Sequence, residues 1–331
     1  MEIMKVNYFY YEFFYIYKGG NMIYTITFNP AIDYILEVDK LEIDEINRAK
    51  AERILAGGKG INVSIVLKNL GIDSVALGFL GGFTGQEIKR KIEKLGVKTD
   101  FVYNPNKLSR INVKLQTNIS GKTIAETAIN SDGPQISEEE INELIKKIEK
   151  IEKGDFIVIS GSIARNMQED IYERICSKAK ENESKIVVDT TGKYLLTALK
   201  YNPFLVKPNK KELEEIFKTK IHSKEEVVTF AQKLQEKGAE NVLISMDQSG
   251  AVLVTKDKKI LYSTAPKGQL VNSVGSGDSM VAGFLTGFIM YDDYEKALKL
   301  GISAGSASAF SKELATKDEI LYQYSKIKDG G

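Results

Sequence analysis

The sequence predicts an α/β fold, in which a mainly parallel β-sheet carries helices on both faces and a small β-sheet forms a lid. Short apolar runs alternate with amphipathic helical segments from residue 22 onward, at a spacing that suits β-α-β units. Residues 33–55 and 109–130 interrupt the alternation and have the pattern of strand pairs without helices. We expect these two stretches to leave the main sheet and form the lid.

Seven segments have the length and composition of buried parallel strands: residues 23–28, 74–80, 155–160, 185–190, 204–207, 241–246 and 251–256. Helices are predicted for residues 61–70, 86–95, 137–153, 166–181, 225–237 and 279–290, and for the small-residue segment 303–310. Ser137 and Glu140 form a capping-box pattern at the start of one of them. Gly71, Gly96 and Gly238 follow three others and predict where these helices end.

The second lid stretch contains a hairpin signal at Asn118, Ser120 and Gly121. The chain has no internal repeat and no long flexible linker, so residues 22–331 are expected to form one domain.

Composition excludes several classes of function. The chain of 331 residues has 46 basic and 45 acidic side chains and a net charge of +1, which provides no basic surface for nucleic acid or for a membrane. The single cysteine, Cys176, cannot form a disulfide within the chain, and a reducing cytoplasm is the expected location. The chain has one histidine, His222, so a multi-histidine zinc site is not possible. This histidine lies between a lysine-rich turn and a predicted helix start, and a histidine-based catalytic triad is not expected.

Residues 1–21 differ in composition from the rest, because they hold eight of the chain's 30 aromatic residues. The apolar run is interrupted by Glu12 and is too short to span a bilayer, so a membrane anchor is the less favoured alternative. We expect this extension to lie outside the fold, with Met22 as the natural start.

A glycine-rich loop near the C-terminus, residues 270–285 (LVNSVGSGDSMVAGFL), precedes an apolar helix. The backbone N–H groups of Gly275, Ser276 and Gly277 can converge on an anion, and the helix dipole adds positive potential there. Asp278 places a carboxylate in this anion site, which is costly unless it removes a proton from a hydroxyl that attacks a phosphoryl group. The alternative is an ordinary turn in which Asp278 caps its helix.

The first glycine-rich segment in chain order, residues 56–68 (AGGKGINVSIVLK), surrounds a lysine and also precedes a helix, and the C-terminal loop is the second. Two such loops indicate two anionic ligands. Neither loop is a Walker A motif and neither completes GxGxxG, so P-loop ATPases and dinucleotide-dependent dehydrogenases lose their main support.

These two segments resemble the ribokinase-like (PfkB-type) sugar kinases, whose members carry a GGKG segment and a G(A/S)GD segment in this order. The resemblance extends from about Met22 to the C-terminus. Residues 23–38, 109–115 and 206–217 are most similar to the branch of the family whose acceptor is fructose 1-phosphate. The resemblance implies ATP-dependent phosphorylation of the 6-hydroxyl, giving fructose 1,6-bisphosphate, with tagatose 6-phosphate as the alternative acceptor.

The resemblance also assigns acceptor-binding positions: Asp33, Gly57, Gly58, Lys59, Asn62, Arg110 and Ser162. Lys59 and Arg110 would neutralise a phosphate already on the sugar. A kinase for a neutral sugar would not require these two cations. A surface ion pair is the alternative for Arg110. Ser162 lies in SGSIARN, where relatives have a proline-containing SGSLP-type sequence, so the sequence departs from the family pattern at this position.

On the nucleotide side, the implied ATP contacts are Lys207, Asn209, Ser245, Gly250, Ser273 and Val274, and Glu212 would act on Mg²⁺ through water. Asp247 occupies a position where relatives usually have glycine. Asp278 is the implied base, assisted by Gly275, Ser276 and Gly277. The family also implies a homodimer through the lid, and a non-catalytic sugar-phosphate sensor on the same fold is the alternative from another class of function.

Overall fold

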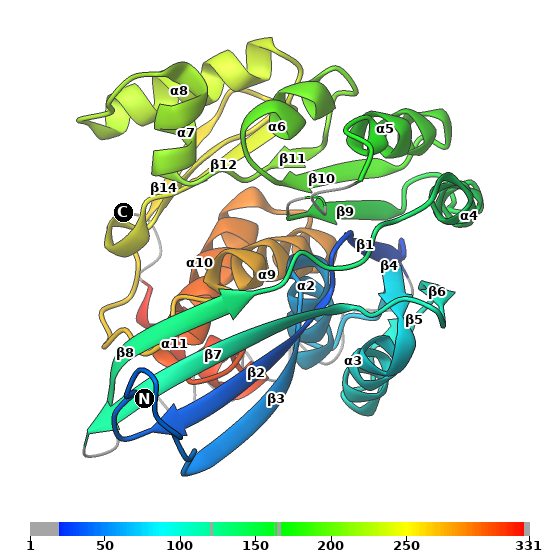
Figure 1. The fold of residues 1–331 in the computed structure, drawn as a ribbon. Coiled ribbons are helices and arrows are strands. Elements are labelled where there is room, and N and C mark those ends of the chain that lie inside the picture. Colours follow the sequence, from blue (N-terminus) through cyan, green and yellow to red (C-terminus); the bar gives the residue numbers. More distant parts are fainter. Residues whose placement is uncertain (1–19, 120–121, 162, 164–166, 328–331) are drawn as a thin grey trace.

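The computed structural model describes residues 20–119, 122–161, 163 and 167–327, and it confirms the α/β prediction (Figure 1). The main sheet has the order β14-β13-β12-β11-β10-β9-β1-β4-β5, with β6 beside β4. All its pairs are parallel except β12–β13 and β13–β14. Its strands are β1 (Ile23–Thr27), β4 (Ser74–Gly81), β5 (Lys98–Thr99), β6 (Val102–Asn104), β9 (Phe156–Ser160), β10 (Lys185–Asp189), β11 (Leu205–Val206), β12 (Asn241–Ser245), β13 (Ala251–Val254) and β14 (Ile260–Ser263).

Helices cover both faces of this sheet, as predicted (Figure 1). They are α2 (Lys59–Asn69), α3 (Gly82–Lys94), α4 (Glu138–Ile148), α5 (Ile171–Glu181), α6 (Gly192–Leu199), α7 (Lys210–Phe217), α8 (Lys224–Glu236), α9 (Ser276–Tyr291), α10 (Tyr294–Phe310) and α11 (Lys317–Lys326), with a short 3₁₀ turn at Asp247–Ser249. The capping box of Ser137 and Glu140 is present at the start of α4. Two helices are shorter than expected, because α4 ends at Ile148 and α5 begins only at Ile171.

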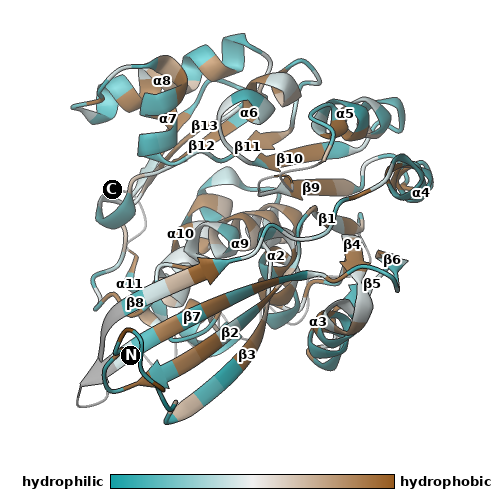
Figure 2. Ribbon diagram, viewed as in Figure 1, coloured by the Kyte–Doolittle hydropathy of each residue, from teal (hydrophilic) through white to brown (hydrophobic). Residues whose placement is uncertain are grey.

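Each central strand is buried on both faces, which explains its nearly continuous apolar sequence. In β9, Phe156 and Val158 face the core beneath α2, α9 and α10, whereas Ile157 and Ile159 face the core beneath α4, α5 and α8. Figure 2 shows the central strands β9 and β10 largely in brown, whereas helices such as α3 and α7 are largely teal. The alternating side-chain direction of a strand therefore supplies two separate cores.

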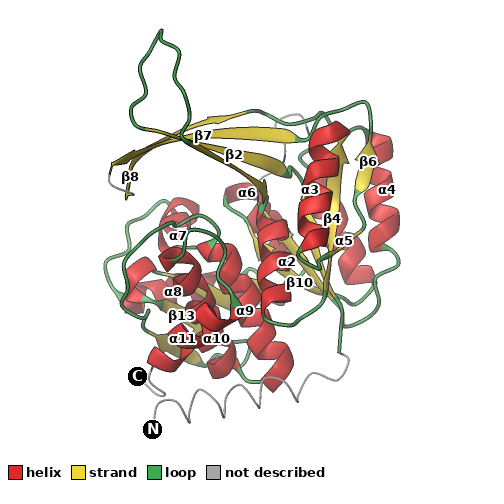
Figure 3. Cartoon of the chain, turned by 90° about the horizontal axis from the view of Figure 1, so that it is seen from below, coloured by secondary structure: helices red, strands yellow, loops and turns green. Residues whose placement is uncertain are grey.

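The lid is a second sheet of four strands, as the two interrupted stretches predicted (Figure 3). Its order is β3-β2-β7-β8, with bounds β2 (Ala31–Val38), β3 (Ala51–Gly57), β7 (Arg110–Ile119) and β8 (Lys122–Asn130). Strands β2 and β7 are parallel and the outer pairs are antiparallel. Of the predicted hairpin turn, Ser120 and Gly121 lie outside the described residues.

The two faces of the lid differ in chemistry. Asp33 is paired in register with Asn112, so these side chains share one face of the sheet, together with Arg110 and Lys114 two residues away on β7. The next row of side chains points the other way and is apolar, with Ile54, Tyr34, Val113 and Ile129 in register across all four strands.

The N-terminal end of the described chain is held to the main sheet. The Met22 N–H donates to Asp155 Oδ1 over 2.7 Å, and Met22 O accepts from the Phe156 N–H. Residues 1–19 of the predicted extension lie outside the described part of the chain. Within that part, no helix combines the length and the apolar composition that crossing a membrane requires.

Candidate active site

The second glycine loop ends at Gly275, which caps the N-terminus of α9 with φ of 80°. A side chain would be strained in this left-handed conformation, and a Cβ would also lie 2.6 Å from Leu314 Cδ2. The Ser276 N–H turns toward Ser273 O at 3.4 Å, whereas Gly277 and Asp278 belong to the first helical turn, whose N–H groups have no intrahelical acceptor. No side chain among the described residues caps this helix, so the capping alternative for Asp278 is not what the structure shows.

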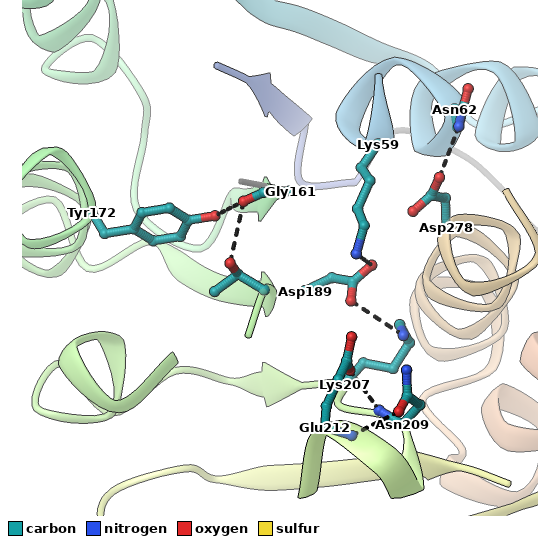
Figure 4. A network of polar contacts seen from close by, with 10 residues as sticks. Lys59, Asn62, Gly161, Tyr172, Asp189, Lys207, Asn209, Glu212 and Asp278 are labelled. Atoms are coloured by element: carbon teal, nitrogen blue, oxygen red, sulfur yellow. Dashed lines mark hydrogen bonds and ion pairs between the residues drawn. The ribbon is translucent and has the colours of Figure 1, made fainter. Parts of the chain in front are cut away.

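Asp278 is buried, with 4% of its surface exposed. Its Oδ2 accepts a hydrogen bond of 2.8 Å from Asn62 Nδ2, which brings the first glycine segment against the second (Figure 4). Burial, and then the negative charge of Asp189, raise the pKa of Asp278 to about 6, although Lys59, Asn62 and Lys207 act in the opposite direction. The group therefore has the pKa of a carboxylate that can accept a proton near neutral pH.

Sequence reasoning missed Asp189, the last residue of β10. Its carboxylate is buried between Lys59 Nζ, at 3.5 Å from Oδ2, and Lys207 Nζ, at 3.2 Å from Oδ1 (Figure 4). Burial alone would raise the pKa of Asp189, but the two lysines hold it below its ordinary value. The available signal was an acidic residue directly after a buried strand, at the sheet edge where ligands bind.

The two lysines lie on opposite sides of Asp189. Lys207 is buried, and a Cβ built on Gly277 would lie 3.3 Å from its Nζ, so the ammonium adjoins the anion loop. Lys59 opens α2, and 39% of its side chain is exposed. Burial opposes the charge of Lys59, but Asp189 and then Asp278 outweigh it and raise the pKa of Lys59. Both lysines act on Asp278 through their charge.

Asp33 lies at the inner end of the lid, beside the first glycine loop. Its Oδ1 accepts a hydrogen bond of 2.7 Å from Asn112, and its Oδ2 pairs with Lys114 Nζ at 3.0 Å. A Cβ on Gly57 would lie 3.1 Å from this carboxylate, so glycine permits the close approach. Two lid side chains, Asn112 and Lys114, thus orient Asp33, which was predicted to bind the acceptor sugar. Sequence reasoning did not select either of these two residues.

Arg110 begins strand β7 on the same face as Asp33. Its Nε is buried without a hydrogen-bond partner among the described residues, and no ion pair of those residues involves it. Arg53, on the same sheet, instead pairs with Glu37 at 3.3 Å. The surface ion-pair alternative for Arg110 therefore finds no support in the described structure.

Ser162 lies outside the described residues, but the residue before it is firmly placed. Gly161 O accepts hydrogen bonds from the buried Tyr172 hydroxyl and from Thr190 Oγ1, and its N–H donates to Asp189 O over 3.0 Å (Figure 4). The loop that carries Ser162 thus starts at the carboxyl end of β9, beside Asp189 at the end of β10.

Two nucleotide-side residues form a capping box at the start of α7. The Asn209 N–H donates to Glu212 Oε2, and the Glu212 N–H donates to Asn209 Oδ1, each over 2.8 Å. Of the Glu212 carboxylate, only Oε2 is engaged by the described residues, which leaves Oε1 for a water-bridged cation. Among the described residues, no three His, Cys, Asp or Glu side chains cluster as a metal site.

The remaining nucleotide-side residues lie on the neighbouring strand end and in the loop before α9. Ser245 ends β12 and forms a bridge to Asn209. Gly250 has φ of 89°, and its ideal Cβ would lie 2.0 Å from Ser263 O, so only glycine fits. Asp247 has φ of 48°, the left-handed conformation that glycine favours and that aspartate tolerates. Ser273 and Val274 are exposed.

The arrangement brings an anion loop, a buried carboxylate and two ammonium groups together at the carboxyl ends of β10 and β11, beneath the polar face of the lid. Such a site can bind two anionic groups and remove a proton between them.

Known proteins are similar to this chain over most of its length. A 1-phosphofructokinase from Bacillus subtilis (strain 168) is 43% identical over 307 residues, which cover 93% of this chain and 99% of that protein. A D-tagatose-1-phosphate kinase from Bacillus licheniformis is 39% identical over 308 residues, which cover 93% of this chain and 99% of that protein. The solved structure of phosphofructokinase-2 from Escherichia coli in complex with fructose-6-phosphate superposes with a TM-score of 0.84 at 27% identity, covering 92% of this chain and 99% of that one.

The family model described as pfkB family carbohydrate kinase matches residues 21–320, a range that contains the lid, both glycine segments and Asp278. The match extends over most of the chain, and the relatives align over nearly their full length. The chain therefore belongs to the pfkB family of carbohydrate kinases, and it is an enzyme that transfers a phosphoryl group from ATP to a sugar.

Proposed function

We propose that the enzyme phosphorylates the 6-hydroxyl of fructose 1-phosphate with ATP, giving fructose 1,6-bisphosphate and ADP. The observation that carries the proposal is the buried Asp278 at the first turn of α9, hydrogen-bonded to Asn62 and flanked by two cations. The names of the relatives from Bacillus subtilis and Bacillus licheniformis support a sugar 1-phosphate as the acceptor.

In the proposed reaction, the Asp278 carboxylate takes the proton of the 6-hydroxyl. At the same time, the oxygen of that hydroxyl attacks the γ-phosphorus of ATP. The bond from the γ-phosphorus to the bridging oxygen breaks, and ADP leaves with the electron pair. The N–H groups at the start of α9 and the Lys207 ammonium beside Gly277 stabilise charge on the transferred oxygens. General-base assistance is worth about 10² to 10⁴ in rate, and positioning and electrostatics supply the rest.

Acceptor selection depends on the lid. Asp33 can accept hydrogen bonds from sugar hydroxyls, and Gly57, Gly58 and Asn62 line the sugar from the end of β3 and the start of α2. Arg110 lacks an ion pair among the described residues, so its guanidinium is available for the phosphate already on the sugar. Lys59 and Ser162 complete the proposed acceptor site.

ATP would lie over Ser245, Gly250, Ser273 and Val274, with its phosphates near Lys207 and Asn209. Glu212 fits a water-bridged Mg²⁺, because its Oε1 is not used by the capping box. A bound Mg²⁺ would neutralise charge on the ATP phosphates.

The function is tested with a coupled assay for ADP across fructose 1-phosphate, fructose 6-phosphate, tagatose 1-phosphate, tagatose 6-phosphate and unphosphorylated fructose. We expect the highest kcat/KM with fructose 1-phosphate. A preference for a tagatose phosphate would replace the named acceptor, and a preference for fructose itself would remove the proposed role of Arg110 and Lys59. Binding of sugar phosphate without ADP formation would instead establish the sensor alternative.

We also propose that two lids pair to form a homodimer. The apolar row Ile54, Tyr34, Val113 and Ile129 crosses the lid on the face opposite Asp33, and Ile129 at its end is 62% exposed. A second copy would cover this row and the edges of the sheet. Sedimentation velocity tests the proposal, because Ile129→Glu should convert a dimer into a monomer.

A reducing cytoplasm is the proposed location. Cys176, the only cysteine of the chain, is buried, and burial raises the pKa of its thiol to about 12, so no thiol chemistry requires an oxidising compartment.

A further inference from the structure

We propose that Asp189 is a positioning residue of the phosphoryl transfer, whose two carboxylate oxygens hold the ammonium groups of Lys59 and Lys207 at separate points beside Asp278. This inference rests on the function proposed above and adds a residue that neither glycine motif contains.

The geometry assigns one oxygen to each lysine. Oδ1 lies 3.2 Å from Lys207 Nζ and Oδ2 lies 3.5 Å from Lys59 Nζ. The side chain of Asp189 is 2% exposed and that of Lys207 is 5% exposed, so this half of the contact is sealed from solvent. Lys59 is 39% exposed and opens α2 within the glycine segment that is assigned to the acceptor. A single buried carboxylate thus links the cation of the nucleotide side to the cation of the acceptor side.

The three residues come from three different elements, which explains why a fixed link is needed. Lys59 opens α2, Asp189 ends β10 and Lys207 follows β11. A lysine side chain is long and flexible, and each ammonium has three donors. One donor directed at Asp189 fixes the position of the ammonium, and the other two remain for phosphate oxygens.

Asp189 also acts on the base through its charge. The groups that act on Asp278 are Lys59 and Asn62 from α2, Asp189 from β10 and Lys207 beyond β11. Burial is the largest influence that raises the pKa of Asp278, and the charge of Asp189 is the second largest. The two lysines lower this pKa. An uncharged residue of the same shape would leave both lysines unopposed, and the pKa of Asp278 would fall.

The test is Asp189→Asn in the full chain, assayed for kcat and KM from pH 5 to pH 9 with the best acceptor of the panel. We expect kcat at pH 7.5 to fall at least about tenfold, and the acid limb of the kcat profile to move down by about one pH unit. A merely structural role would lower activity without moving that limb. An unchanged kcat, or a lower kcat with the parental limb, would overturn the proposal.

Asp73→Asn is the matched control, because Asp73 also bridges two lysines, Lys68 at 2.9 Å and Lys98 at 3.0 Å, but on the surface away from the site. Asp73→Asn should change neither kcat nor the position of the acid limb of the kcat profile. If Asp189→Asn does not fold, Asp189→Glu carries the test, since it keeps the charge and displaces the lysines. We expect a lower kcat with the parental limb for that variant, and parental kcat would overturn the inference.

The two proposals can fail separately. If the parent prefers another acceptor, the named substrate is wrong, and the comparison of Asp189 variants is made with the acceptor that the panel identifies. If the parent phosphorylates no member of the panel, the proposed function fails before any variant is compared. If the parent is active and the variants are indistinguishable from it, only the role of Asp189 is lost.

Discussion

Asn62 and Asp278 lie 216 positions apart in the sequence and are joined by a hydrogen bond of 2.8 Å between Nδ2 and Oδ2. Asn62 is in the first turn of α2, just after Gly57, Gly58 and Gly60, and Asp278 is in the first turn of α9, just after Gly275 and Gly277. The bond therefore places the proposed base at the point where the acceptor loop meets the anion loop. Any movement of one loop changes the environment of the other.

Asp278→Asn should leave the fold and ATP affinity intact and lower kcat by at least about 10²-fold, because the amide keeps the shape but cannot take the proton. The coupled assay measures kcat, and equilibrium binding of ATP measures the affinity. Asp292→Asn is the control, since Asp292 is exposed at the other end of α9 in a left-handed conformation that asparagine also adopts. Activity of Asp278→Asn within about twofold of the parent would exclude Asp278 as the base.

The pH dependence of kcat should follow the ionisation of Asp278. Burial raises its pKa to about 6, so the carboxylate is in the active, deprotonated form above that pH and is protonated below it. We expect kcat to be constant from about pH 7 to pH 8 and to fall about tenfold for each unit below pH 6. Stopped assays with the parent measure this limb, and activity that stays level down to pH 5 would contradict the assignment.

The sequence was sufficient for the central fold because its strands are buried on both faces. In β9 every residue is buried, so composition alone identifies the strand. Strands β5 and β6 have two and three residues, and the edge strand β14 follows a charged turn, so none of them has a clear apolar period. Their existence depends on pairing with β4 and β13, two strands that the sequence does predict, rather than on a pattern of their own.

The site could be predicted where local sequence creates the chemistry, as in the two glycine loops and Asp278. Asp189 was not found, because its significance arises only when Lys59 and Lys207 approach it from other elements. The departure at Asp247 has a local explanation, since its φ of 48° is accessible to aspartate as well as to glycine.

Deletion of residues 1–21 should leave kcat/KM within about twofold and the midpoint of thermal unfolding within about 2 °C, because exposed termini contribute little unless they are tied down. The new amine at Met22 can still donate to Asp155 Oδ1, which already accepts from the Met22 N–H. Assays and thermal melts of the shortened chain check this. Deletion of residues 1–27, which removes β1 between β4 and β9, is the matched control and should prevent folding. Loss of activity in the shorter deletion would show that the extension is structural.

Arg110→Ala should raise KM for fructose 1-phosphate by about 10- to 100-fold and leave KM for ATP nearly unchanged, because a charge-assisted contact contributes about 1.5 to 3 kcal/mol. The prediction follows from the guanidinium of Arg110 on the polar face of the lid, whose Nε has no hydrogen-bond partner among the described residues. Initial rates with each substrate varied in turn separate the two constants. Fructose itself should be a poor substrate for the parent. In the variant, the difference in kcat/KM between fructose 1-phosphate and fructose should be smaller.

Arg53→Ala is the matched control for this prediction, because Arg53 lies on the same sheet but pairs with Glu37. It should change the KM of fructose 1-phosphate by less than about threefold, which is the scale of a partly exposed ion pair. If Arg110→Ala raises KM for ATP as much as for the sugar phosphate, the arginine stabilises the site as a whole. If it alters neither KM, the phosphate of the acceptor is bound elsewhere, and Lys59 becomes the remaining cation for that role.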